Sequence, residues 1–197
     1  MKNAYYTKMW DRLYKPVTRL YPLDVSGAEN VPDESVLLCA NHSAWIDPVL
    51  VVASLPNTYD LRIMGKKELF KLPLLRRFLT KMGVFPVDRG HSDLQAVKTA
   101  IGSLKDGWSL LIFPEGTRVH HPGDVSPKGG AAMMAIRSGV KMLPVFIGTG
   151  KRLFRRTSVI FGEPYTPVYS GRKGTAEEYQ ANADEIMRRV YELGGVK

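Results

Sequence analysis

The feature that most constrains this chain is a series of short apolar runs, each followed directly by polar residues. Residues 36–40 form the first run, and His42 and Asp47 come just after it. Residues 109–113 and 142–147 are further runs of this kind. A run without polar alternation is typical of a strand that is buried on both faces. Ligands of open α/β sheets bind beyond the carboxyl ends of the strands, so we expect His42 and Asp47 to lie at a ligand site.

Segments with helical signals lie between these runs. Ser92 with Gln95 predicts a capping box at the start of one helix, and Thr175 with Glu178 predicts another before the last helix. Further strands are expected at residues 61–64, 83–89 and 158–161, and turns at residues 22–34. Strands that alternate with helices predict the α/β class. We therefore expect a single domain with a mixed or largely parallel sheet flanked by helices.

Composition limits the kinds of site and partner. The chain has 197 residues, of which 44% are hydrophobic, and this fits one domain with a substantial core. The single cysteine, Cys39, excludes a disulfide framework and a zinc site built on cysteines. His120 and His121 have no evident third ligand, so no metal site is expected there. The net charge of +9 favours anionic partners, namely phosphorylated ligands, acidic carrier proteins, anionic lipids or nucleic acid.

Two segments combine apolar and basic side chains. Residues 1–21 hold aromatic residues at helical spacing, together with five bases and one acid. Residues 66–82 hold eight large apolar side chains, six bases and one acid. Either segment suits a helix at a membrane interface, or a helix docked on the core with a basic outer face. No run reaches the roughly 20 apolar residues of a membrane span, and no signal peptide is apparent.

His42 and Asp47 have the residue types of a general base and its orienting carboxylate. They are five residues apart, and Pro48 blocks a regular helix through them, so a turn can bring the side chains together. A carboxylate that accepts one imidazole N–H fixes the tautomer, and the other ring nitrogen can then take a proton from a hydroxyl. Ser43 would also suit a serine hydrolase, but the chain has no Gly-x-Ser-x-Gly turn.

Other predicted strands also end in residues that can bind an anion. Arg89 and Arg118 carry guanidinium groups, which can bind phosphate through paired hydrogen bonds. Gly116 permits close approach of the backbone to a ligand, and Lys66 and Lys67 follow a further strand. A base together with several phosphate binders predicts an acceptor that carries both a hydroxyl and a phosphate.

Four blocks, in order, resemble the motifs of the glycerolipid acyltransferases. Residues 41–48 match the Asn-His-x-x-x-x-Asp-Pro motif, residues 83–89 look like the second block, residues 113–118 the third and residues 143–145 the fourth. The match covers residues 36 to about 165. The resemblance implies a glycerol-3-phosphate acyltransferase-like fold with an apolar groove for the acyl chain, and neither a metal nor an organic cofactor. Residues 22–197 would then form the acyltransferase domain.

The resemblance also implies a reaction and roles for residues. The subgroup that this chain resembles moves an acyl group from acyl-CoA or acyl-carrier protein to the 2-hydroxyl of lysophosphatidic acid. His42 would be the base and Asp47 would orient it. The residues expected to bind substrate are Lys66, Lys67, Arg89, Glu115, Gly116, Thr117 and Arg118.

The sequence departs from the family pattern at two points. Many relatives carry N-terminal membrane spans that this sequence does not show, so we expect peripheral, monotopic attachment to the anionic cytoplasmic face of the cell membrane. Val119 stands where a serine often follows the arginine. Two alternatives stay open: acylation of another lysophospholipid or lipid, and a basic module that binds membranes or nucleic acid. Four ordered motifs favour an enzyme, so no nucleic-acid partner is expected.

Overall fold

The centre of the molecule is a seven-stranded sheet, seen in a computed structural model that describes residues 4–56, 59, 61–88 and 93–195. The strand order is β1-β7-β6-β2-β5-β3-β4. β6 and β7 pair antiparallel, and the other neighbouring strands pair parallel. The predicted α/β class with a largely parallel sheet is confirmed. The strands are β1 (Leu23–Ser26), β2 (Val36–Ala40), β3 (Leu61–Lys66), β4 (Val84–Val87), β5 (Ser109–Ile112), β6 (Lys141–Ile147) and β7 (Thr157–Phe161).

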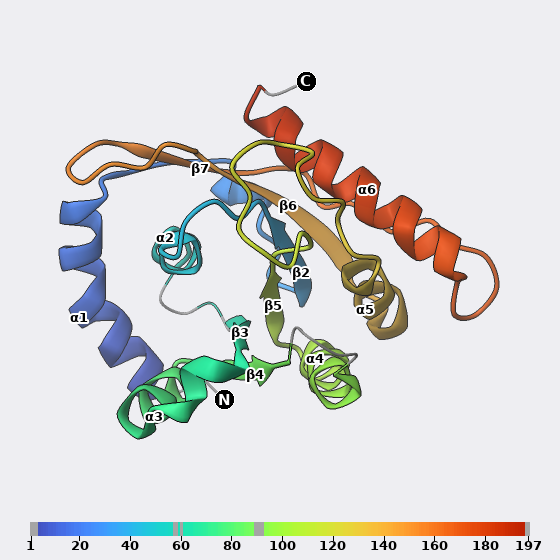
Figure 1. Ribbon diagram of the computed structural model, residues 1–197, viewed down its shortest axis with the longest axis horizontal. Coiled ribbons are helices and arrows are strands. Elements are labelled where there is room, and N and C mark those ends of the chain that lie inside the picture. Colours follow the sequence, from blue (N-terminus) through green and yellow to red (C-terminus); the bar gives the residue numbers. More distant parts are fainter. Residues whose placement is uncertain (1–3, 57–58, 60, 89–92, 196–197) are drawn as a thin grey trace.

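Helices cover both faces of this sheet (Figure 1). On one face lie α1 (Ala4–Leu20) and α2 (Asp47–Ala53). On the other lie α4 (Leu94–Lys105), α5 (Gly130–Ser138) and α6 (Ala176–Leu193). The connection from β3 to β4 holds two short helices, η2 (Lys67–Lys71) and α3 (Pro73–Lys81), and η1 (Ala28–Asn30) follows β1. Two-sided cover is what parallel strands need, because each crossover must travel over a face of the sheet.

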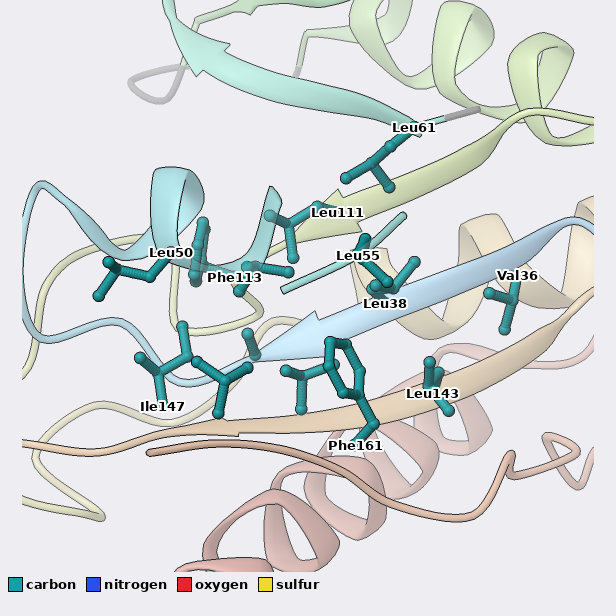
Figure 2. Close-up of a cluster of buried hydrophobic side chains, with 14 of the residues drawn as sticks. Val36, Leu38, Leu50, Leu55, Leu61, Leu111, Phe113, Leu143, Ile147 and Phe161 are labelled. Atoms are coloured by element: carbon teal, nitrogen blue, oxygen red, sulfur yellow. The ribbon is translucent and has the colours of Figure 1, made fainter. Parts of the chain in front are cut away.

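The core explains why the residues of β2 are apolar at every position. Its odd and even residues face opposite sides of the sheet, and all five are fully buried. Leu38 packs into a cluster with Leu50 of α2, which Figure 2 shows from the side. Leu37 and Cys39 pack into a second cluster with α4, α5 and α6. Each buried Leu or Val contributes roughly 1.5–3 kcal/mol, so the strand that carries the candidate site is firmly anchored.

Three local expectations are wrong or incomplete. Residues 22–34 were expected to be turns, yet they contain β1, an edge strand whose side chains are mostly exposed and therefore carry no apolar run. Within residues 66–82, expected to form one helix, the structure has two short helices, η2 and α3, because Pro73 begins a new helix. The N-cap of α4 is Asp93, whose side chain accepts from Ala96 N, so the predicted cap by Ser92, which lies outside the described residues, is wrong. The capping box before α6 is confirmed.

Candidate functional site

The loop that leaves β2 is fixed by the side chain of Asn41. Its amide nitrogen donates to Ile147 O at 2.9 Å, and its amide oxygen accepts from Ile147 N at 2.7 Å. These two bonds tie the end of β2 to the end of β6. Asn41 therefore holds the start of the loop that carries His42 in a fixed position. The sequence pattern alone did not indicate this role of Asn41.

His42 and Asp47 meet as the spacing allows. α2 begins at Asp47, with Pro48 in its first turn, and the carboxylate turns back over the loop. Asp47 Oδ2 lies 3.0 Å from His42 Nδ1 and accepts from Ser43 N and Ala44 N, at 2.7 Å each. The carboxylate thus holds Nδ1 and leaves the imidazole Nε2 as the nitrogen that can face a substrate.

Phe113 fixes the plane of the His42 ring. The two rings stack with their centroids 4.2 Å apart and their planes 24° from parallel. Both side chains are largely buried, and His42 O accepts from Val119 N at 2.8 Å. The third motif block therefore packs directly against the first, as expected for polar clusters at the carboxyl ends of neighbouring strands.

Lys151 is the residue that the sequence reasoning missed. It follows β6, its side chain is only 4% exposed, and its Nζ lies 2.8 Å from Asp47 Oδ1. The same ammonium donates to Ser43 Oγ at 2.7 Å. Burial raises the pKa of the Asp47 carboxyl, but the hydrogen bond from His42 and the charge of Lys151 outweigh it, so that the pKa lies below its ordinary value. Asp47 is therefore an ionised carboxylate at neutral pH.

Glu115 has internal partners for both carboxylate oxygens. Oε2 accepts from His42 N at 3.1 Å, and Oε1 accepts from the hydroxyl of Tyr191 on α6. The residue is 2% exposed, and burial raises the pKa of its carboxyl despite the hydrogen bonds from Tyr191 and His42. Glu115 was expected among the substrate-binding residues. These contacts instead support a positioning role, in which it holds the His42 loop against α6.

The rest of the third block faces outward. Gly116 has φ of +70°, a conformation that favours glycine, and an added Cβ would lie 3.1 Å from Lys128 Cε. Thr117 and Arg118 are exposed. Among the described residues no carboxylate forms an ion pair with Arg118, so its guanidinium is available to a ligand.

The other predicted phosphate binders lie at varying distances from this cluster. Lys66 ends β3 in the same cavity wall as His42 and Arg118, and its ammonium pairs loosely with Glu68 at 3.8 Å. Lys67 points elsewhere, with its Nζ 3.3 Å from Asp88 Oδ2. Arg89 lies outside the described residues. The described structure therefore gathers Lys66 and Arg118 around His42 and leaves the expectation for Arg89 a prediction.

An apolar cavity of about 370 Å³ opens beside His42. α1, α2, β3, α3 and β4 build its walls, and the polar side chains of its lining are few. α1 closes one side, where Trp10 Nε1 donates to Val52 O of α2 at 3.2 Å and the Trp10 ring stacks on Tyr14. A pocket of this kind suits a hydrocarbon chain with a polar end near His42.

The described part of the chain has neither a cluster of metal-binding side chains nor a helix that could span a membrane. Histidine, cysteine and carboxylate side chains do not gather in threes as a metal site requires. None of the helices in the described ranges has both the length and the apolar composition of a membrane span.

Comparisons with known proteins agree with one another. A model of the acyltransferase family matches residues 22–148. The 1-acyl-sn-glycerol-3-phosphate acyltransferase of Bacillus subtilis is 34% identical over 176 residues, which is 86% of each chain. A lyso-ornithine lipid O-acyltransferase of Pseudomonas aeruginosa is 31% identical over 64% of this chain and 48% of that protein. The crystal structure of the 1-acyl-sn-glycerophosphate (LPA) acyltransferase of Thermotoga maritima superposes with a TM-score of 0.67 and 27% identity, over 95% of this chain and 78% of that chain.

Proposed function

The chain belongs to the acyltransferase family, and we propose that it moves a fatty acyl group from an acyl thioester to the 2-hydroxyl of lysophosphatidic acid. One observation carries the proposal. His42, held by the buried Asp47, stands in the wall of an apolar cavity, together with the cations Lys66 and Arg118. A base, a hydrocarbon pocket and phosphate-binding side chains are what a lysolipid acceptor and an acyl donor require.

The chemistry follows from the orientation of the imidazole. Asp47 accepts from Nδ1, so Nε2 takes the proton of the acceptor hydroxyl as its oxygen attacks the thioester carbonyl carbon. A new C–O ester bond forms and the C–S bond breaks. The imidazolium then returns the proton to the departing thiolate, which leaves as a thiol. Asp47 stays ionised throughout and stabilises the imidazolium, with Lys151 holding the carboxylate in place.

The acceptor phosphate is assigned to the exposed part of the third block. Gly116, Thr117 and Arg118 follow β5 at the same end of the sheet at which His42 follows the parallel neighbour β2, and Arg118 lines the cavity with His42. Lys66 adds a cation from the end of β3. Arg89 belongs to the proposal by its sequence motif. Charge-assisted bonds of this kind contribute about 1.5–3 kcal/mol each, enough to favour a phosphate-bearing acceptor.

We place the reaction at a membrane surface, because a lysolipid resides in a bilayer. α1 packs on α2 and lines the cavity, yet its bases Lys15 and Arg19 stay exposed beside exposed Leu20. In the β3–β4 connection, Leu72 and Leu74 are 62% and 86% exposed among basic residues. Both segments therefore combine contact with the protein and a basic, apolar outer surface, which supports peripheral attachment to anionic lipid.

A second candidate acceptor is a lyso-ornithine lipid, which the Pseudomonas aeruginosa relative favours by its name. This acceptor lacks a phosphate, so the two candidates can be separated directly. Purified protein is incubated with acyl-CoA or acyl-carrier protein and with lysophosphatidic acid, lysophosphatidylcholine or lyso-ornithine lipid. We expect the highest kcat/KM with lysophosphatidic acid. Equal or higher kcat/KM with the phosphate-free acceptor would overturn the acceptor assignment, and the two donor arms identify the thioester.

A further inference from the structure

The connection between β6 and β7 ends in an unusual turn. Arg155 N donates to Arg152 O at 3.2 Å, so residues 152–155 form a β-turn with Leu153 and Phe154 at its centre. We call residues 152–156 the β6–β7 tip. Figure 1 shows this connection reaching past the end of the sheet beside α1, where Phe154 N donates to Leu20 O at 2.7 Å.

The two central side chains of the tip are apolar and face solvent. Leu153 is 54% exposed and Phe154 is 67% exposed. Phe154 also has φ of +61° and is the single non-glycine residue with positive φ among those described. A bulky residue in the left-handed region is strained, whereas glycine would adopt it freely. The chain thus holds an aromatic ring in solvent at a conformational cost, which points to a role outside the folded chain.

The rest of the tip is cationic. Arg152, Arg155 and Arg156 are exposed, and none of them forms an ion pair with the described carboxylates. The sequence has no acid between Gly148 and Gly162. Three guanidinium groups that flank two apolar side chains complement a surface with phosphates outside and hydrocarbon beneath.

We propose that the β6–β7 tip is a membrane-docking element that inserts Leu153 and Phe154 into an anionic bilayer while its arginines bind lipid phosphates. Arg19 and Leu20, at the end of α1, continue this surface, because the bond from Phe154 N to Leu20 O joins the two segments. The base of the same connection carries Lys151, which contacts Asp47. Docking through the tip would therefore bring the bilayer to the end of the molecule where the site lies.

Sedimentation with vesicles tests the charge component. The full chain is mixed with vesicles of phosphatidylglycerol and phosphatidylcholine, or of phosphatidylcholine alone, at low and high salt. In the triple variant Arg152→Gln/Arg155→Gln/Arg156→Gln we expect partitioning to anionic vesicles to weaken roughly 100-fold, because each base near an anionic surface contributes roughly fivefold. The matched control replaces exposed bases on the opposite face of the sheet, with the same change in net charge: Lys98→Gln/Lys105→Gln/Arg137→Gln. An equal loss in both triple variants would overturn the proposal in favour of long-range attraction by the whole charge.

A fluorophore tests insertion directly. The native cysteine, Cys39, is fully buried, so Phe154→Cys can be labelled selectively with an environment-sensitive dye. We expect the emission to shift to the blue with anionic vesicles and to stay unchanged with free inorganic phosphate. Leu94→Cys, at a position 71% exposed on α4, should show no shift with either. The same emission at Phe154→Cys with and without vesicles would refute insertion.

The variant Phe154→Gly tests whether the Phe154 ring serves vesicle binding or the stability of the fold. If the ring served the fold, glycine would lower the melting temperature. In our account glycine relieves the backbone strain, so the melting temperature stays the same or rises while vesicle binding falls about tenfold. The proposal rests on the proposed function only for the idea that the acceptor lies in a bilayer. Vesicle binding without turnover would contradict the enzyme assignment alone, and turnover of a soluble short-chain acceptor without vesicle binding would contradict the docking element alone.

Discussion

Replacing Lys151 by methionine tests whether the ion pair between Lys151 and Asp47 stabilises the candidate site. The Lys151 side chain is 4% exposed, and its ammonium lies 2.8 Å from a carboxylate oxygen of Asp47, whose side chain is fully buried. Methionine keeps much of the side-chain volume but removes the charge. Because this change leaves the buried carboxylate of Asp47 without its cationic partner at Oδ1, we expect the free energy of unfolding to fall by about 3–5 kcal/mol.

The loss should depend on pH in a definite direction. The pKa of Asp47 is lowered in the folded protein, so its ionised form contributes stability above its unfolded pKa of about 3.9. That contribution disappears as the pH falls through the folded pKa. The difference between the parent and Lys151→Met should therefore be largest near neutral pH and should shrink below about pH 4.

Urea unfolding followed by circular dichroism measures these values, with two controls. Lys141→Met breaks an ion pair to Glu34 whose side chains are 49% and 66% exposed, so it should cost less than about 1 kcal/mol. The double variant Lys151→Met/Asp47→Asn removes both charges. Its loss of unfolding free energy should be smaller than the sum of the losses in the two single variants. A loss of stability in Lys151→Met as small as that in Lys141→Met would show that the Lys151–Asp47 ion pair does not stabilise the site.

Four further outcomes follow from the site. Asp47→Asn should lower kcat by roughly 10²–10⁴-fold with the fold kept, because an amide can favour the wrong imidazole tautomer; near-parent kcat would argue against the pair. Arg118→Ala should raise KM for lysophosphatidic acid by about 10- to 150-fold, whereas Arg137→Ala on the opposite face should leave KM unchanged. Tyr191→Phe leaves a buried oxygen of Glu115 without its donor, so urea unfolding should show a loss of about 1–3 kcal/mol, and no loss would remove the structural role given to this bond. Val52→Trp fills part of the cavity and should lower kcat/KM for long-chain relative to medium-chain donors by about tenfold; an unchanged ratio would place the acyl chain elsewhere.

The sequence predicted those parts of the fold that local chemistry determines. β2, β5 and β6 were predictable because strands buried on both faces carry runs of consecutive apolar side chains. The capping box of α6 was predictable because its two partners, Thr175 and Glu178, are only three residues apart in the sequence. β1 was missed because an exposed edge strand of four residues has no such pattern.

In the candidate site, too, contacts between residues close in sequence could be predicted, whereas contacts between distant residues could not. His42 and Asp47 are neighbours in sequence, so their spacing indicated the contact. Lys151 reaches Ser43 across 108 positions, and Tyr191 reaches Glu115 across 76. Contacts of this kind depend on how the strands are ordered in the sheet, and a single sequence carries no local signal for that order. Lys151 and Tyr191, which hold Asp47 and Glu115 in place, therefore emerged only from the structure.

In the proposed mechanism His42 takes the proton of a lysolipid hydroxyl during acyl transfer. The most direct measurement is the release of free thiol from an acyl thioester by purified parent and His42→Ala protein, with and without lysophosphatidic acid. Circular dichroism and urea unfolding of both proteins verify that each is folded. We predict thiol release that requires lysophosphatidic acid in the parent and falls roughly 10²–10⁴-fold in His42→Ala. Near-parent turnover by folded His42→Ala, or thiol release in the parent that does not depend on the acceptor, would rule out His42 as the base for this acceptor.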